Sequence, residues 1–381
     1  MAVLGLDPLI SLTTATRLPP EEIVSGWRVN SVTPRHPLAR VITPATVGGK
    51  AFSLYRMSQM GLCVPPACVL SMSAWRLWKA DPVGTRLPKL CSHAFNFVAQ
   101  HAGSRNKLAV RSGAPVSMPG MMDTKLDVGE GGVYAAVVEV FNSFESPRCR
   151  AYRTAHGIGE IGTAVIIQAM APMESSTIGG AGVACSIDPV TGRGWGVFGE
   201  VVPGMRGNKL VGGEVTPIAI SKWRRSHAKL YDLLRIGLAA LENEWGAPVE
   251  VEFAWCGGAL FYLQCRAAKI SHPALYGFTQ VRGRWLGRGR SASGGTAKGI
   301  VSTAVNFHEG GVWVAPITTP EDYPLMVKST GIVTLTGGTT CHAAVVAREM
   351  KVPCVVAYDG EPLLSGMEIV VDGGTGEVYA A

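Results

Sequence analysis

The stretch TLTGGTTCHAAVVAREM, residues 334–350, joins an apolar segment to an alanine- and valine-rich segment through a pair of glycines. The apolar residues before the glycines predict a strand, and the segment behind them predicts a helix capped by Thr339 or Thr340. His342 is therefore expected in the first turn of that helix. There the helix dipole disfavours the imidazolium, so we expect the pKa of the ring to be lowered.

Three interpretations of His342 follow from this position. A neutral imidazole is a nucleophile, and a phosphoryl group placed on it would meet the unpaired N–H groups of a helix start. A metal ligand is disfavoured, because no second histidine or acidic residue lies nearby with ligand spacing. The local pattern by itself favours a histidine that is satisfied at a helix start.

The composition is that of a folded protein with two or three domains. The chain has 381 residues, of which 47% are hydrophobic and 17% charged, and it contains 47 glycines. Apolar runs stay shorter than the ~18 residues of a membrane span, and the N-terminus lacks the basic region of a signal peptide. We therefore expect no membrane segment.

The cysteines indicate the compartment of the protein, and the charges indicate the kind of ligand it binds. The nine cysteines are scattered in apolar contexts, which predicts reduced thiols and a cytoplasmic location. The net charge is +7, but the basic residues are dispersed, and RWLGRGR (284–290) is the dense run. A small polyanionic ligand accounts for this charge, so we expect no nucleic-acid partner.

Patterning along the chain predicts four segments. Residues 1–45 form an irregular arm or surface strand, and residues 46–270 alternate strands, helices and glycine turns. Residues 271–293 are rich in glycine, arginine and aromatic residues, which is typical of a linker. Residues 294–381 alternate strands and helices as a smaller α/β unit.

The stretch VEVEFAWCGGALFYLQCR predicts a hairpin that carries polar pairs. Glu250 and Glu252 share one face of their strand, as do Gln264 and Arg266 on theirs. A two-residue Gly-Gly loop would set Glu252 opposite Leu263 and separate the pairs, whereas a three-residue Cys-Gly-Gly loop would bring them together. Converging carboxylates would suit Mg²⁺ that bridges phosphates, and a solvated hairpin face is the alternative.

Two cationic residues stand at positions that suit an anion. Lys50 follows two glycines and opens a predicted helix, whose N-terminus favours phosphate, although the stretch is not a Walker loop. Arg111 ends the apolar run LAVRSG, and an arginine there requires an anionic or polar partner. Structural pairing is the commoner explanation for such an arginine.

Taken in order, these stretches resemble the pyruvate phosphate dikinase and phosphoenolpyruvate synthase family. The resemblance runs from about residue 46 to the end and is carried by GGKAFSLYRMSQMGLCVPPACVLS, LAVRSGAPVSMPGMMDTKLDVG, GAGVACSIDPVTG, VEVEFAWCGGALFYLQCR, TGGTTCHAAVVARE and VDGGTGEVY. It implies an α/β (α+β) chain: an ATP-grasp nucleotide domain followed by a swivelling β/β/α phosphohistidine domain.

The resemblance also implies an activity, an ATP-dependent phosphotransfer of the dikinase type. His342 would attack a phosphate of ATP, AMP would leave, and the phosphoryl group would pass to an acceptor, expected to be a small molecule. Thr340 matches a position near the histidine that is a regulatory phosphorylation site in some plant members. The residues implied for ATP and Mg²⁺ are Lys50, Arg111, Gly179, Gly180, Gly182, Glu200, Glu250, Glu252, Gln264 and Arg266.

The chain also departs from the family pattern. Glu250 stands where the dikinase commonly has aspartate, and GGEVTP (212–217) lacks an arginine before Thr-Pro. The chain stops at Ala381, before the barrel that binds pyruvate and phosphoenolpyruvate in the family. This leaves two alternatives open: a split dikinase whose acceptor barrel is a separate subunit, or a non-catalytic nucleotide-binding regulator.

Overall fold

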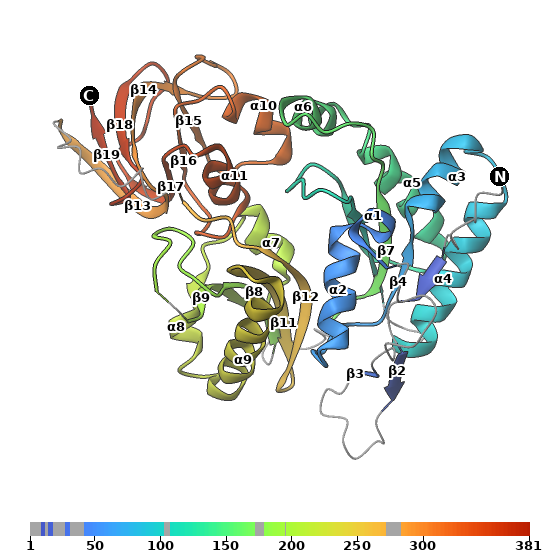
Figure 1. Ribbon diagram of the computed structural model, residues 1–381. Helices are drawn as coiled ribbons and strands as arrows, with labels where there is room; N and C mark the ends of the chain where they lie inside the picture. The colour runs from blue at the N-terminus through green and yellow to red at the C-terminus, as the bar shows by residue number, and fades with distance from the viewer. Residues whose placement is uncertain are drawn as a thin grey trace. The chain divides into compact units, whose positions relative to one another are not determined.

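The computed structural model of the chain describes residues 9–11, 14–17, 27–30, 42–102, 107–171, 179–194, 196–271 and 283–381. The chain folds into two compact units (Figure 1). The first contains residues 1–174 and 255–266, and the second contains residues 175–254 and 267–381.

The first unit is built on an antiparallel sheet. Its strands run in the order β1 (Leu9–Ser11), β4 (Ala67–Leu70), β7 (Ala164–Ala169), β5 (Leu108–Gly113) and β6 (Thr124–Val128). A separate hairpin, β2 (Thr14–Arg17) with β3 (Trp27–Asn30), lies in the predicted arm. Strands therefore do form in this arm, and β1 joins the main sheet.

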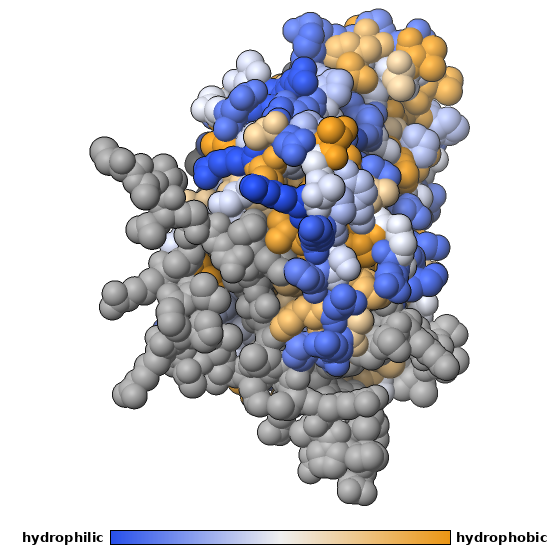
Figure 2. Space-filling model, turned by 90° about the vertical axis from the view of Figure 1, so that its right-hand side faces the viewer, coloured by the Kyte–Doolittle hydropathy of each residue, from blue (hydrophilic) through white to orange (hydrophobic). Residues whose placement is uncertain are grey.

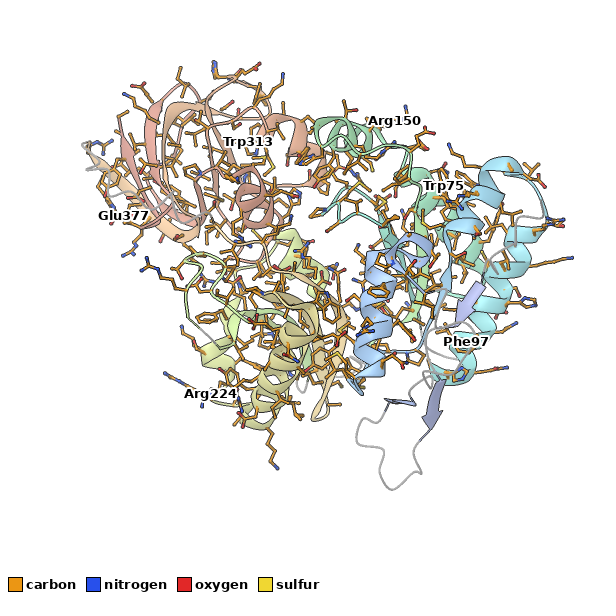
Figure 3. All side chains as sticks on the ribbon, viewed as in Figure 1. Trp75, Phe97, Arg150, Arg224, Trp313 and Glu377 are labelled. Atoms are coloured by element: carbon orange, nitrogen blue, oxygen red, sulfur yellow. The ribbon has the colours of Figure 1, made fainter. Side chains whose placement is uncertain are left out.

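Helices cover this sheet, and in Figure 1 strands β4 and β7 lie between α2 and α4. The helices are α1 (Pro44–Val47), α2 (Gly49–Gln59), α3 (Met72–Ala80), α4 (Arg86–Ala102), α5 (Val133–Ser143) and α6 (Pro147–Ala155). Ser71 caps α3 by accepting a hydrogen bond from the Ser73 N–H, as the sequence predicts. Trp75 of α3 packs edge-on against Phe144, with ring centroids 5.8 Å apart (Figure 3).

The second unit contains most of another sheet. Its strand order is β10 (Ile218–Ala219), β9 (Phe198–Pro203), β8 (Gly179–Cys185), β11 (Val249–Cys256) and β12 (Ala259–Ala267). Three helices belong to this region: α7 (Gly207–Gly212), α8 (Ile220–Trp223) and α9 (Ala228–Trp245). The predicted helix over 223–245 is thus confirmed as α9, with α8 as a separate turn before it.

The turn between β11 and β12 is made by two glycines. The strand bounds leave Gly257 and Gly258 in the loop, with φ of 57° and 86°. Both glycines are in the left-handed region, as a tight turn between two strands requires. The convergence of Glu250, Glu252, Gln264 and Arg266 stays a prediction.

The rest of the second unit is a closed barrel. Its strand order is β13 (Trp285–Ser293), β17 (Cys354–Gly360), β16 (Gly331–Thr334), β15 (Val312–Ala315), β14 (Thr296–Ser302), β18 (Glu368–Asp372) and β19 (Glu377–Ala380). Valines from β14–β19 pack together with Ile369 in its core. Trp313, labelled in Figure 3, is almost fully buried. Helix α11 (His342–Met350) and the short α10 (Tyr323–Met326) accompany the strands.

The barrel corrects the predicted linker. Residues 285–293 were expected to be irregular, but they form β13, which pairs with β17 and β19. The glycines of this strand permit close packing: a Cβ at Gly287 would lie 2.6 Å from the Asp359 carbonyl oxygen, and one at Gly289 would lie 2.5 Å from that of Val356. Residues 272–282 lie outside the described ranges.

The surface and the thiols agree with a folded, reduced chain. All nine cysteines are described and none forms a disulfide, as predicted. The face in Figure 2 carries mainly hydrophilic side chains with separate hydrophobic ones between them. Among the helices of the described ranges, none combines the length and the apolar character needed to cross a bilayer.

Candidate active site

His342 is the first residue of α11, as the sequence predicts. Strand β16 is buried between the parallel strands β15 and β17, and the loop behind it turns at Gly337, whose φ is +105°. The capping prediction was wrong, because Cys341 occupies the N-cap position in place of either threonine. Thr340 lies one position before the N-cap, and its hydroxyl donates to Oε2 of Glu200.

The two ring nitrogens of His342 have different surroundings. Nδ1 lies 3.0 Å from Oγ1 of Thr318, a side chain that is itself buried. Nε2 is buried too, and it has no hydrogen-bond partner among the described residues. Because the Thr318 hydroxyl can donate as well as accept, this contact orients the ring in either neutral tautomer, and attack through Nε2 requires the tautomer in which Nδ1 carries the proton and donates it to Thr318.

Burial keeps this ring neutral. It lowers the pKa of His342 from 6.5 to about 4, against the carboxylates of Asp322 and Glu321, which raise it. The predicted direction is confirmed, but the chief cause is desolvation instead of the helix dipole. At neutral pH the imidazole therefore lacks the second proton and retains its nucleophilic lone pair.

The lowered pKa of His342 makes the free energy of unfolding depend on pH. The unfolded ring takes up a proton below about 6.5 that the folded ring excludes until about pH 4. The contribution of His342 is therefore complete above pH 6.5 and is lost as the pH falls toward 4, to a total of about 3 kcal/mol. Urea unfolding at pH 7.5, 6 and 5 should show a steeper loss for the wild type than for His342→Gln. Parallel curves for the two proteins would contradict this assignment.

Thr318 is a site residue that the sequence analysis missed. It lies before Thr319, which begins a short 3-10 turn, Pro320–Asp322, and the Thr319 N–H donates to Oδ2 of Asp322 at 2.7 Å. That capping pattern can be recognised in the sequence and predicts an ordered loop. It does not predict the contact with His342, which is 24 residues away.

Replacement of Thr318 by valine should slow the phosphorylation that the sequence predicts for His342 by roughly tenfold to a hundredfold, because the ring loses the bond that orients it. The measurement is the rate at which labelled phosphate appears on the chain. Thr318→Ser keeps the hydroxyl and should stay close to the wild-type rate. Equal rates for the valine variant and the wild type would show that Nδ1 needs no partner.

Glu200, expected at the ATP site, holds the histidine loop in this structure. Its buried Oε1 accepts from Nη1 of Arg290 at 2.8 Å, and its Oε2 accepts from the N–H and the hydroxyl of Thr340 at 3.2 and 3.0 Å. The loop lies so close that a Cβ at Gly338 would be 2.2 Å from Oε2. A nucleotide role for Glu200 stays a prediction, whereas its role in the loop is observed.

Lys50 and Arg111 are placed by one backbone contact in the first unit. The Gly49 N–H donates to the Ala114 carbonyl at 2.9 Å, directly behind the strand that carries Arg111. Gly48 has a φ of +79°, and a Cβ there would lie 1.7 Å from the Gly113 carbonyl oxygen. The glycine turn is therefore needed to seat the start of α2 against the end of β5.

The Arg111 guanidinium is oriented by three oxygens of the same unit. Nη1 donates to the Leu263 carbonyl at 2.8 Å and to Oε1 of Gln168 at 3.3 Å, and Nη2 donates to Oε1 of Gln264 at 3.1 Å. Arg111 and Gln264, both expected at the ATP site, are thus in direct contact. Arg266 is half-buried near the end of the same strand, β12.

The glycines expected to cover phosphates lie in strand β8. Gly179, Gly180 and Gly182 are buried, and β8 pairs with β9 along its length. A Cβ at Gly182 would lie 2.6 Å from the Phe253 ring and 2.8 Å from Val201. Gly182 therefore makes room for core packing, and phosphate contact by the three glycines stays a prediction.

Glu250 and Glu252 of β11 suit a hard cation. Glu250 is buried and accepts a weak bond from the Cys185 thiol at 3.9 Å, and Glu252 is half-buried. Oxygen ligands from one or two carboxylates, completed by substrate phosphates, are the usual surroundings of protein-bound Mg²⁺. Among the described residues, no cluster of three or more metal-ligating side chains occurs.

Family models match both parts of the chain. The model for the AMP/ATP-binding domain of pyruvate phosphate dikinase matches residues 76–232, and the model for the mobile domain of phosphoenolpyruvate-utilising enzymes matches residues 307–376. The second match contains both Thr318 and His342. The matched parts of the chain thus belong to the domain families of pyruvate phosphate dikinase and of phosphoenolpyruvate-utilising enzymes.

Relatives in this family are distant. A probable phosphoenolpyruvate synthase of Methanothermobacter thermautotrophicus is 26% identical over 87% of this chain and 61% of its own length. One from Archaeoglobus fulgidus is 29% identical over 75% and 45%. The chloroplastic pyruvate, phosphate dikinase 1 of Oryza sativa is 26% identical over 87% and 51%. The chain thus spans about half the length of these dikinases and synthases.

Proposed function

We propose that this chain transfers phosphoryl groups from ATP to Nε2 of His342 and then to an acceptor, expected to be a small molecule. One observation carries the proposal: the ring is buried and neutral, Nδ1 is held by Thr318, and Nε2 has no hydrogen-bond partner among the described residues. A buried histidine with a purely structural role would be expected to have hydrogen-bond partners for both ring nitrogens.

The proposed step balances as a displacement at phosphorus. Nε2 attacks the β-phosphorus of ATP, a nitrogen–phosphorus bond forms, and the bond to the α,β-bridging oxygen breaks, so that oxygen leaves with AMP. His342 then carries two phosphoryl groups. Water or inorganic phosphate takes the terminal group, and the remaining one passes to the acceptor. Catalysis of this kind rests on positioning and on neutralisation of phosphate charge.

The chain's own residues would divide that work. Lys50, Arg111, Gln264 and Arg266 would bind and orient ATP, and Glu250 with Glu252 would hold Mg²⁺, which supplies charge neutralisation when bound. Thr318 would hold the orientation of the ring, and Thr340 would fix the loop through Glu200. We place the nucleotide region within residues 46–270 and the phosphohistidine domain from residue 285 onward.

The names of the relatives suggest a first candidate for the phosphoryl acceptor. Their names point to pyruvate or phosphoenolpyruvate, and in that case the pyruvate-binding part could come from a separate subunit. Chasing the labelled chain with pyruvate, then with other small carboxylic acids, measures which of them removes the phosphoryl group.

The test of the transfer itself uses the purified full chain with Mg²⁺ and ATP labelled at the β-phosphate. We expect acid-labile label on the chain, accompanied by release of AMP. ADP as the product, or label that survives acid, would contradict a dikinase-type transfer to histidine.

A further inference from the structure

Gln168 is the polar residue of an otherwise apolar strand. All six residues of β7, AVIIQA, are buried, and Gln168 is 2% exposed. β7 lies between β4 and β5, and Gln168 stands opposite Ala67 on one side and Ala109 on the other. A buried amide costs free energy unless its oxygen and nitrogen find partners, so both ends of this side chain require an explanation.

The orientation of this amide is determined by its neighbours. Nε2 donates to the Pro65 carbonyl at 3.3 Å, and Oε1 accepts from Nη1 of Arg111, also at 3.3 Å. The Pro65 carbonyl can only accept and the guanidinium can only donate, so a flipped amide would lose both bonds. Gln168 therefore presents oxygen, and no other atom, to Arg111.

The bond acts on a guanidinium that is held by other oxygens of the same unit as well. The oxygens of Gln168, Leu263 and Gln264 together contact both terminal nitrogens of Arg111. Nη1 is held by Gln168 and Leu263 together, so the Gln168 bond takes part in fixing the plane of the guanidinium.

We infer that Gln168 is a positioning residue that acts through Arg111: it holds the guanidinium in the orientation that receives a phosphate group of ATP. This inference rests on the proposed function, because it takes ATP as the ligand of Arg111. It gives β7 a part in nucleotide binding, although the Gln168 side chain is buried in the sheet.

A double-mutant cycle tests the inference by equilibrium binding of Mg·ATP to the full chain. Gln168→Leu should weaken ATP binding by roughly tenfold in the wild-type background and by less than about twofold in the Arg111→Met background, since the effect passes through Arg111. A structural role would weaken binding equally in both backgrounds. Gln100→Leu, at an exposed position of α4, is the matched control and should bind as the wild type does.

A second variant covers the case in which Gln168→Leu fails to fold. Gln168→Glu keeps the shape but puts a carboxylate against Arg111, and it should also weaken ATP binding roughly tenfold at pH 8. Folding of each variant is checked by its thermal unfolding midpoint.

The outcomes separate this inference from the proposed function. Equal effects of Gln168→Leu in the two backgrounds, or unchanged ATP affinity in both folded Gln168 variants, would overturn the inference alone. A wild-type chain that binds ATP with this sensitivity but never labels His342 would overturn the transfer step and leave the inference standing. A wild-type chain that does not bind ATP would overturn both.

Discussion

Replacement of His342 by alanine should reduce acid-labile labelling from ATP to background, while ATP affinity stays close to that of the wild type. The reason is that Nε2 is the proposed nucleophile, and alanine has no atom that can take its place. Residues proposed to bind ATP lie elsewhere in the chain, so binding and transfer should separate. The two measurements are the label retained on the chain and the equilibrium binding of Mg·ATP.

The matched control is His308→Gln, which changes an exposed histidine of the same barrel. It should label as the wild type does. His342→Gln adds a variant of similar bulk, in case alanine disturbs the buried start of α11. Labelling that persists in both His342 variants would place the nucleophile elsewhere and end the proposed mechanism.

Replacement of Glu200 by leucine should destabilise the chain by roughly 3 kcal/mol, which is the size of the cost when one partner of a buried charge cluster is removed. The change leaves the Thr340 N–H and hydroxyl without their acceptor in a buried loop. The lost pairing with Arg290 adds less, because that side chain is 38% exposed and partly screened by water. Urea unfolding measures the effect.

An exposed ion pair of the same barrel provides the control. Lys298 and Glu368 are both more than half exposed, and Lys298→Met should change stability by less than about 1 kcal/mol. ATP binding by a folded Glu200→Gln variant distinguishes a role in the histidine loop from a role at the nucleotide. A carboxylate that serves the loop alone should leave the affinity for ATP unchanged. A large loss of affinity would show that the carboxylate serves the nucleotide instead.

Much of the local structure was predictable from sequence. The glycine turn into α2, the serine cap of α3, helix α9 and the strand–turn–helix around His342 all appear where periodicity and turn residues predicted them. Two local predictions failed. Strand β13 resembled a linker because its glycines serve close pairing between strands, and the threonine cap of α11 failed because the helix begins at His342, which makes Cys341 the N-cap residue.

The candidate site was predictable in its residue types but less so in their partners. The motifs identified Arg111, Gln264 and His342, and the structure brings the first two into contact. Thr318, Arg290 and Gln168 were missed because each belongs to an unremarkable segment and gains a role only from a side chain far away. The low pKa of His342 was predicted in direction, but its cause, burial, depends on packing around the loop.

The positions of strands, turns and helices around the histidine could be predicted from the sequence, because backbone propensities, glycine freedom and apolar periodicity act over a few neighbouring residues. Which side chains contact one another depends on the tertiary structure. Thr318 reaches His342 across 24 positions, Glu200 reaches Thr340 across 140, and Arg111 reaches Gln264 across 153. Such contacts follow from how strands pair and close into sheets and a barrel, so no local pattern announces them.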